Sequence, residues 1–122
     1  MIVDDHEEVR ASLARLVRDW GHEVVVAADG VTALSVAVAF QPEWAVVDLS
    51  MRGMSGIELG RRLRQQFPPA QLRLIALSGY AGVDIRDACR AAGFCAYLVK
   101  PGDIPELEPL LGSDADSDAP QD

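Results

Sequence analysis

Short apolar runs alternate with longer segments of mixed character along most of the chain. The runs predict five β-strands, over residues 1–3, 23–27, 44–48, 72–78 and 96–99. The run from Trp44 to Val47 contains no polar residue, which is typical of a strand buried on both faces of a parallel sheet. Val24, Val25 and Val26 are β-branched and favour a strand as well.

The segments between these runs predict helices. In the first of them, apolar residues recur on one face at helical spacing: Val9, Leu13, Leu16, Val17 and Trp20. Further helices are predicted over 31–40, 55–66 and 83–92. A last helix is predicted from about Pro105, and we expect it to be short or distorted because Pro109 follows only four residues later.

Capping residues support three of the helix starts. Asp5 and Glu8 have the spacing of a capping box, as do Ser55 and Glu58. Asp29 stands directly before the second helix and is a candidate cap.

The predicted elements follow the order strand, helix, five times over. Parallel strands joined by right-handed crossover helices form one doubly wound sheet with helices on both faces. We therefore predict an α/β fold with a five-stranded parallel sheet in a single domain over residues 1–111. Residues 112–122 are rich in Gly, Ser, Asp, Ala and Pro, and predict a disordered acidic tail.

Composition narrows the class of protein. The formal net charge of −8 argues against direct binding of nucleic acid, because phosphate backbones need a basic surface. We find neither an apolar run of membrane-spanning length nor a signal-peptide pattern. The two cysteines, Cys89 and Cys95, are typical of small buried residues in a reduced cytosolic protein, so we expect a cytoplasmic location.

Polar side chains gather at the carboxyl ends of four predicted strands. Asp4 and Asp5 follow the first strand, and Asp48 ends the third. Ser78 ends the fourth strand, and Lys100, the single lysine beside ten arginines, follows the fifth. These ends share one edge of the sheet, where open α/β sheets carry their sites, so we expect the five side chains to converge there.

This set of side chains indicates phosphoryl chemistry. Three carboxylates held together raise one another's pKa unless a positive charge compensates. Mg²⁺ fits, since it is typically bound by one or two carboxylates with water and phosphate oxygens. A lysine ammonium suits a phosphoryl oxygen, a serine hydroxyl adds a neutral donor, and a carboxylate can be the nucleophile that forms an aspartyl phosphate.

The chain resembles the receiver domain of two-component response regulators in motifs that share its order and approximate spacing: Val3-Asp4-Asp5, Asp48, Ser78-Gly79 and Lys100-Pro101. The resemblance covers about residues 1–111 and implies the flavodoxin-like receiver fold. It also implies a signalling role rather than a metabolic enzyme. Two further stretches, Leu77–Tyr80 and Ala92–Phe94, look most similar to receivers attached to hybrid histidine kinases.

The resemblance implies a role for each site residue. Asp48 would accept a phosphoryl group from a histidine of a partner kinase or phosphotransfer domain. Asp5, Asp48 and the backbone carbonyl of Ser50 would bind Mg²⁺, with Asp4 contributing through water. Lys100 would bind a phosphoryl oxygen.

The resemblance also implies a conformational switch. Ser78 would move to hydrogen-bond the phosphoryl group. Tyr97, three residues before Lys100, matches an aromatic switch position that turns inward on activation. The Lys100–Pro101 peptide bond would be cis.

Two positions depart from the family pattern. Arg52 stands where the family usually has proline, and would loosen the loop or place a positive charge near the metal. Gly102 stands where an aromatic residue often follows the Lys-Pro pair. With two prolines nearby, the fifth helix looks atypical, so we expect at most a weak homodimer through the fourth and fifth helices.

Each site residue also has a simpler interpretation by itself. Asp5 fits a helix cap, Asp48 a turn and Lys100 a solvated charge. Ser78 fits an ordinary loop serine, and His6 fits an exposed residue of the first helical turn. The joint placement of the acids, the lysine and the serine favours a site.

Other functions stay open from the sequence. A pseudo-receiver would act by protein binding alone. A metal-dependent phosphohydrolase similar to haloacid dehalogenases would have a second acid two residues after Asp48, where this chain has Ser50. A flavodoxin-like cofactor binder would need a phosphate loop after the first strand, where Asp4 and Asp5 stand. With no output domain in the sequence, we expect a free-standing relay protein or the receiver of a parent hybrid kinase.

Overall fold

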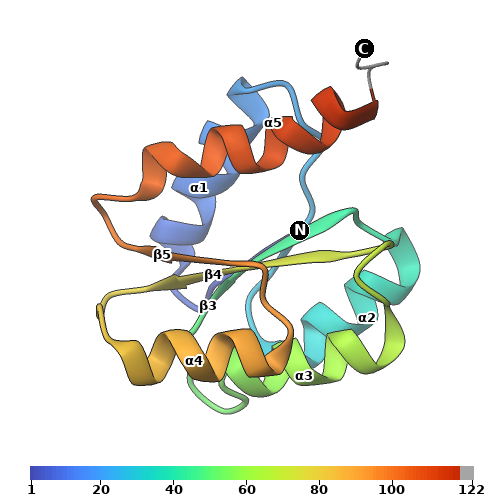
Figure 1. The fold of residues 1–122 in the computed structure, drawn as a ribbon. Helices are drawn as coiled ribbons and strands as arrows, with labels where there is room; N and C mark the ends of the chain where they lie inside the picture. Colours follow the sequence, from blue (N-terminus) through green and yellow to red (C-terminus); the bar gives the residue numbers. More distant parts are fainter. Residues whose placement is uncertain (119–122) are drawn as a thin grey trace.

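Five parallel strands form one sheet in the computed structural model, and helices cover both of its faces (Figure 1). The backbone is described for residues 1–118 and the side chains for residues 1–112. The strands lie in the order β2-β1-β3-β4-β5. Their bounds are Ile2–Val3 (β1), Val26–Ala27 (β2), Trp44–Asp48 (β3), Arg73–Ser78 (β4) and Ala96–Val99 (β5). The predicted doubly wound α/β fold is confirmed.

The helices form a layer on each side of the sheet. Helices α1 and α5 lie on one face, and α2, α3 and α4 lie on the other (Figure 1). Their bounds are Glu7–Asp19 (α1), Gly30–Phe40 (α2), Gly56–Gln66 (α3), Val83–Ala92 (α4) and Leu107–Asp118 (α5), with a 3₁₀ turn, η1, at Ile104–Glu106.

Strand β3 is the centre of the sheet, and all five of its residues are buried. Trp44 and Val46 belong to the core under α1 and α5, whereas Ala45 and Val47 belong to the core under α2, α3 and α4. Both faces of the strand therefore need apolar side chains, which explains why the run shows no alternation. Asp48 then ends the strand at its carboxyl edge, opposite Leu77 of β4.

Two of the three predicted helix caps are present. Asp29 Oδ1 accepts a hydrogen bond of 2.7 Å from the Thr32 amide, and Ser55 Oγ accepts one of 3.1 Å from the Glu58 amide. The predicted capping box of Asp5 is wrong. Helix α1 has His6 at its N-cap without a side-chain cap bond, because the Asp5 carboxylate is oriented toward a different loop, as described below.

The second strand is shorter than predicted. Only Val26–Ala27 of the predicted range 23–27 is assigned to β2. This strand lies at the edge of the sheet and pairs only with β1, whose two residues offer two positions in the ladder, Ile2 with Val26 and Val3 with Ala27. The length of β1 therefore limits the length of β2.

The last helix differs from the prediction in length. Pro105 lies in η1, and Pro109 lies in the first turn of α5, where a missing backbone N–H is tolerated. Leu107 and Leu111 are buried and anchor the helix on the sheet. Once nucleated, a helix propagates at little cost, so its backbone continues to Asp118 through part of the predicted disordered tail. The rest of that tail, residues 119–122, lies outside the described residues.

Arg64 joins three segments on the α3 and α4 side of the sheet. Its Nη1 donates to the carbonyl oxygens of Phe67 at 3.0 Å and Leu72 at 2.8 Å, and its Nη2 donates to that of Gly93 at 2.9 Å. These carbonyls belong to the end of α3, the start of β4 and the turn after α4. A single guanidinium therefore satisfies backbone acceptors that the sheet and the helices leave unpaired.

We predict that Arg64→Ala lowers the free energy of unfolding by about 2–4 kcal/mol, because three carbonyl groups lose their donor. Urea denaturation followed by circular dichroism measures this loss. Arg62→Ala is a matched control, since Arg62 is half exposed and pairs with Glu58 at 3.0 Å on the same helix; we expect it to lose about 0.5 kcal/mol or less. Equal losses for the two variants would contradict the structural role of Arg64.

Candidate functional site

Three acids and a lysine from the ends of three strands meet at the carboxyl edge of the sheet. Asp4 and Asp5 follow β1, Asp48 ends β3 and Lys100 follows β5. The Lys100 ammonium lies 3.3 Å from Asp48 Oδ1 and 3.9 Å from Asp4 Oδ2. The acids and the lysine that the sequence analysis singled out are therefore neighbours in the folded chain.

Burial distinguishes these residues from ordinary surface charges. Asp4 and Asp48 are 1% and 3% exposed, and the Lys100 side chain is 26% exposed. A glycine at the start of α3 allows the close packing behind Asp48. A Cβ atom at Gly56 would lie 2.5 Å from the Asp48 carbonyl oxygen, so the helix can approach the end of the strand only without a side chain there.

Asp5 is held by the loop that follows β3. Its Oδ2 accepts a hydrogen bond of 2.9 Å from the Arg52 amide and one of 3.4 Å from Arg52 Nε. The backbone hydrogen bond is the main reason why the pKa of Asp5 lies below its usual range. The acids were predicted to raise one another's pKa unless a positive charge compensates, and at Asp5 the compensation comes from Arg52. A proline at this position would lack the backbone donor.

The pKa of Asp4 is shifted in the opposite direction to that of Asp5. Burial raises its pKa, and the negative charge of Asp48 raises it further. A hydrogen bond of 2.9 Å from the His6 amide to Asp4 Oδ1 and the charge of Lys100 act against this rise. The net effect is a raised pKa, so the ionised form of Asp4 is unfavourable in the folded protein.

Two carboxylate oxygens at this edge are buried and accept no hydrogen bond, Asp4 Oδ2 and Asp5 Oδ1. Buried oxygens of this kind are what a hard divalent cation binds, so the donor set fits Mg²⁺. Among the described residues, the group of acidic and histidine side chains close enough to share one ion comprises Asp4, Asp5 and His6. The ligand role predicted for Asp48, whose Oδ1 lies near Lys100, stays a prediction.

The two predicted serines make different contacts. The Ser50 amide donates to Asp48 Oδ1 at 3.3 Å, and the role predicted for its carbonyl stays a prediction. Ser78 is fully buried, and its Oγ accepts a hydrogen bond of 3.0 Å from the Tyr80 amide. Its carbonyl accepts one of 2.7 Å from the Lys100 amide. The Ser78 hydroxyl thus contacts the following loop rather than the acids.

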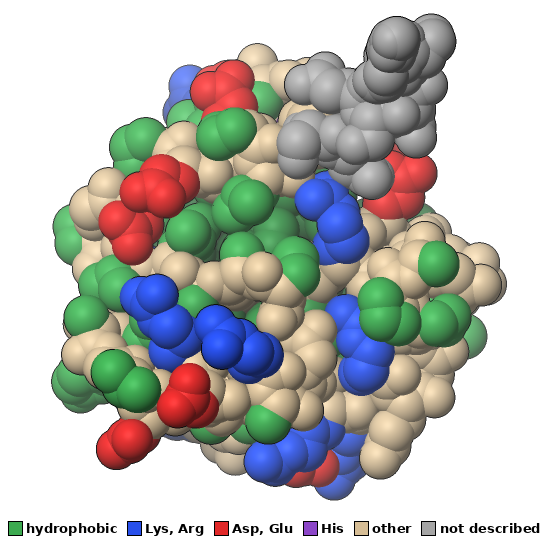
Figure 2. Space-filling model, viewed as in Figure 1, with side chains coloured by type: hydrophobic (Ala, Val, Ile, Leu, Met, Phe, Trp, Pro, Cys, Tyr) green, Lys and Arg blue, Asp and Glu red, His purple; other side chains and the backbone are tan. Residues whose placement is uncertain are grey.

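Tyr97 lies away from the acids, on the face formed by β5 and α4. Its hydroxyl donates a hydrogen bond to the Tyr80 carbonyl, and the Arg86 guanidinium lies 5.3 Å from the centre of its ring. Basic side chains gather over α4 and β5 on this face (Figure 2). The Lys100–Pro101 bond between this region and the site is cis, as expected.

His6 and Arg10 also take part in the site, and neither was predicted to. His6 Nδ1 lies 3.3 Å from Asp5 Oδ1, and Arg10 Nη1 donates to the Asp4 carbonyl at 2.9 Å. The position of His6 directly after two acids was a signal for this role, although His6 was predicted to be only an exposed residue of the first helical turn. Its side chain is indeed 75% exposed, yet the ring lies beside the acids.

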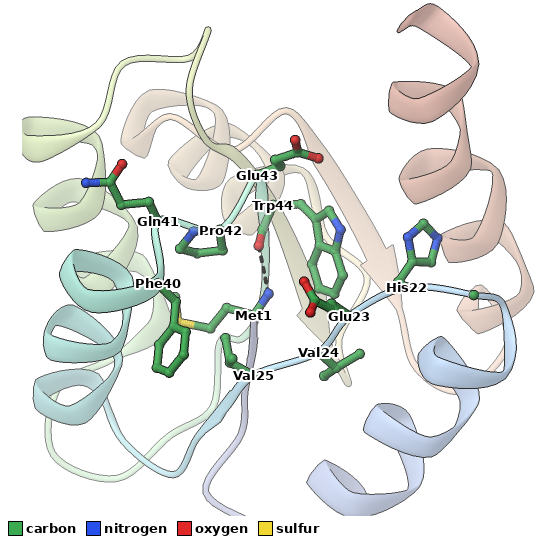
Figure 3. A pocket seen from close by; sticks show the side chains of 11 residues that line it. Met1, His22, Glu23, Val24, Val25, Phe40, Gln41, Pro42, Glu43 and Trp44 are labelled. Carbon is green, nitrogen blue, oxygen red and sulfur yellow. Dashed lines mark hydrogen bonds between the residues drawn. The ribbon is translucent and has the colours of Figure 1, made fainter. Parts of the chain in front are cut away.

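A hollow of about 640 Å³ lies at the opposite edge of the sheet. Side chains and backbone near the starts of β1 and β3 line it, including Met1, Val25, Phe40, Glu43 and Trp44 (Figure 3). The Met1 amine donates to the Trp44 carbonyl at 2.8 Å inside it. The hollow is distant from the four charged side chains, so it is separate from the candidate site.

The structure thus places an acidic cluster and a lysine at the carboxyl edge of a doubly wound parallel sheet, and comparison with protein families gives the class of protein. Residues 1–111 match the response regulator receiver domain family. The chain belongs to this family and is a receiver domain of two-component signalling.

Individual relatives support this assignment. An uncharacterised 14.6 kDa protein of Leptolyngbya boryana is 37% identical over 111 residues, which cover 91% of this chain and 85% of that protein. The transcriptional regulatory protein PdtaR of Mycobacterium tuberculosis is 30% identical over 113 residues, 91% of this chain and 53% of that protein. The structure of the Vibrio cholerae chemotaxis protein CheY4 superimposes with a TM-score of 0.84 at 28% identity, covering 92% of this chain and 93% of CheY4.

The chain thus spans about half the length of PdtaR, and a larger share of the other two proteins. Within the described residues, we find no helix with the length and apolar character needed to cross a membrane.

The raised pKa of Asp4 predicts that Asp4→Asn stabilises the protein at neutral pH in the presence of EDTA. A carboxyl with a raised folded-state pKa stabilises the fold below its unfolded pKa, and this contribution is lost as the pH rises through the folded pKa. The melting temperature of Asp4→Asn should therefore exceed that of the wild type increasingly as the pH rises above about 4, and the free energy of unfolding should finally differ by about 1 kcal/mol.

Asp5→Asn is the matched control for this measurement. The pKa of Asp5 is lowered, so its ionised form stabilises the fold above the unfolded pKa. Asp5→Asn should therefore reduce the melting temperature at pH 7. Stabilisation by both substitutions, or by neither, would contradict the difference between the two acids.

Proposed function

We propose that residues 1–111 form a phosphoaccepting receiver unit, in which Asp48 takes a phosphoryl group from a phosphohistidine of a partner in a Mg²⁺-dependent reaction. The observation that carries this proposal is the placement of Asp48. Its carboxylate is almost fully buried and lies 3.3 Å from the Lys100 ammonium. At the same edge, Asp4 and Asp5 each have a buried oxygen that accepts no hydrogen bond.

The reaction is a direct transfer. An oxygen of the Asp48 carboxylate attacks the phosphorus atom, and the P–N bond to the partner's imidazole breaks as the O–P bond forms. The electron pair of the broken bond stays on the imidazole nitrogen. Lys100 contributes a positive charge next to the accepting oxygen, where the charge of the phosphoryl oxygens has to be balanced.

Asp5, Asp48 and the Ser50 carbonyl would hold the magnesium ion, with Asp4 acting through water. When bound, Mg²⁺ supplies positive charge that offsets the repulsion between the acids and the phosphoryl oxygens. Asp4 and Asp5 orient that charge, because each keeps one buried oxygen without a hydrogen-bond donor. Arg52 fixes Asp5 from the loop side through the other oxygen.

The partner is a histidine kinase or a histidine phosphotransfer domain, and the receiver unit would act in the cytoplasm, either as a free-standing relay protein or as part of a hybrid kinase. A homodimer would be weak. The acidic balance of the chain, with a net charge of −8, supports a protein partner rather than nucleic acid. One observation favours a second function, a pseudo-receiver that acts by binding alone: Arg52 already places a positive charge on Asp5.

The proposed conformational switch involves Ser78 and Tyr97. Both now contact the Tyr80 backbone, Ser78 through the amide and Tyr97 through the carbonyl. If Ser78 Oγ turned to the phosphoryl group, it would release the Tyr80 amide and change the loop to which Tyr97 is hydrogen-bonded. The two side chains are thus coupled through one residue, which gives phosphorylation a route to the α4 and β5 face.

We predict that incubation with acetyl phosphate and Mg²⁺ adds one phosphoryl group to the wild-type chain, as measured by intact mass spectrometry. Asp48→Ala and omission of Mg²⁺ should both abolish the adduct. Lys100→Ala should slow its formation by at least about tenfold, because an aligned charge is lost.

The control for a short-lived adduct is beryllofluoride, whose Mg²⁺-dependent binding can be followed by NMR. Chemical-shift changes around Asp48 without a mass adduct would mean fast hydrolysis and would support the proposal. No adduct and no beryllofluoride binding would contradict phosphoacceptance and support the pseudo-receiver. Turnover of a generic phosphate ester would instead indicate a phosphohydrolase.

Tyr97→Phe removes the hydrogen bond to the Tyr80 carbonyl and keeps the ring beside Arg86. We predict that it leaves phosphorylation of Asp48 intact but weakens the NMR response of α4 to beryllofluoride. An unchanged α4 response would contradict the coupling through Tyr80. Tyr80→Phe is the matched control, because the exposed Tyr80 ring is not part of these hydrogen bonds.

A further inference from the structure

His6 gives the acid edge a nitrogen ligand. Its Nδ1 lies 3.3 Å from Asp5 Oδ1 and 3.8 Å from Asp4 Oδ1. Two ligands bound to one ion at about 2.1 Å each are separated by about 3 to 4 Å. Both distances from His6 Nδ1 fall in this range, and the three residues offer one ligand atom each within 4.8 Å of one another.

The carboxylates beside His6 point to a ligand independently of the histidine. Asp4 is 1% exposed, and its Oδ2 accepts no hydrogen bond. Asp5 Oδ1, the oxygen nearest to His6 Nδ1, is also buried and accepts none. Buried polar atoms are nearly always hydrogen-bonded. Asp4 Oδ2 lies 3.9 Å from the Lys100 ammonium, beyond hydrogen-bond distance, and Asp5 Oδ1 lies beside the His6 imidazole. Two buried oxygens that accept no hydrogen bond therefore indicate a site for a positively charged ligand.

The backbone fixes His6 in this position. It is the N-cap residue of α1 in an extended conformation, and its amide donates to Asp4 Oδ1. Its imidazole, 75% exposed, leaves the outer side of the group open to solvent. An ion could therefore enter from solvent and keep water ligands on that side.

The chemistry of the ligands decides which ions fit. Mg²⁺ prefers oxygen ligands and gains little from an imidazole, whereas Zn²⁺, Ni²⁺ and Co²⁺ bind imidazole nitrogen well. We propose that His6, Asp5 and Asp4 form a mixed nitrogen–oxygen site that binds a divalent transition-metal ion more tightly than Mg²⁺. The inference rests on the proposed function in one respect, because Asp5 serves both cations.

Such an ion would compete with Mg²⁺ for Asp5. Because Arg52 occupies Asp5 Oδ2, only the oxygen that faces His6 is left for either cation. A transition-metal ion at His6 therefore changes the state of the phosphoryl site rather than occupying an unrelated surface.

The test is calorimetric titration of the full chain, free of any polyhistidine tag, with Zn²⁺ and with Mg²⁺ separately. The variants are the wild type, His6→Ala and His22→Ala. His22 is the matched control, because it is the other histidine of the chain and lies beside Trp44 at the opposite edge of the sheet. NMR of the imidazole ¹⁵N nuclei identifies which nitrogen binds Zn²⁺.

We expect the wild type to bind Zn²⁺ at least about tenfold more tightly than Mg²⁺. His6→Ala should weaken Zn²⁺ binding about tenfold or more and leave Mg²⁺ binding within about twofold. His22→Ala should change neither, and Zn²⁺ should shift the Nδ1 resonance of His6.

Three results would overturn the inference. Unchanged Zn²⁺ affinity in His6→Ala would mean that His6 only forms an ion pair with the acids. If Mg²⁺ still bound in the same titrations, the proposed function would remain supported. A loss of Zn²⁺ binding in His22→Ala alone would place the ion elsewhere. Absence of binding of both ions to the wild type would also overturn the proposed magnesium site.

Discussion

The ammonium group of Lys100 is the constraint on which the carboxyl edge of the sheet depends. It reaches from the end of β5 to Asp48 on β3 and Asp4 after β1, at 3.3 and 3.9 Å. Two carboxylates that are almost fully buried would otherwise repel each other in surroundings less polar than water, where repulsion is stronger. One cation from the end of β5 thus allows the ends of two strands, β1 and β3, to carry acids side by side.

This arrangement is more favourable for binding than for stability. Asp4 has a raised pKa because its charge is buried, whereas Asp5 is stabilised by donors from Arg52. Each of the two acids nevertheless keeps one buried oxygen without a donor. A fold selected for stability alone would pair or remove these oxygens, so their presence is typical of a site whose missing charge comes from a ligand.

The sequence predicted the centre of the sheet well because β3 and β4 are buried on both faces, and a continuous apolar run such as that of Trp44–Val47 is too short for a buried helix. It also predicted which strand ends meet. The carboxyl ends of parallel strands share one edge of the sheet, which brings Asp4, Asp48 and Lys100 together. The contacts between loops could not be predicted from the sequence. The shorter of the two Arg52 hydrogen bonds to Asp5 comes from a backbone amide that any residue except proline supplies. The length of α5 depends on the packing of Leu107 and Leu111 rather than on local composition.

The choice of basic residues has a chemical consequence. The other ten basic side chains are arginines, so Lys100 is the single lysine of the chain, and amine acylation acts on lysine and not on guanidinium groups. Lysine acetylation therefore has one side-chain target in this protein, and that target is partly exposed. Neutralising it would remove the charge between Asp4 and Asp48 while leaving the ion pairs of Asp5 and Glu58 with arginine intact. A single acyl group on this side chain would thus leave two buried carboxylates facing each other without the cation between them.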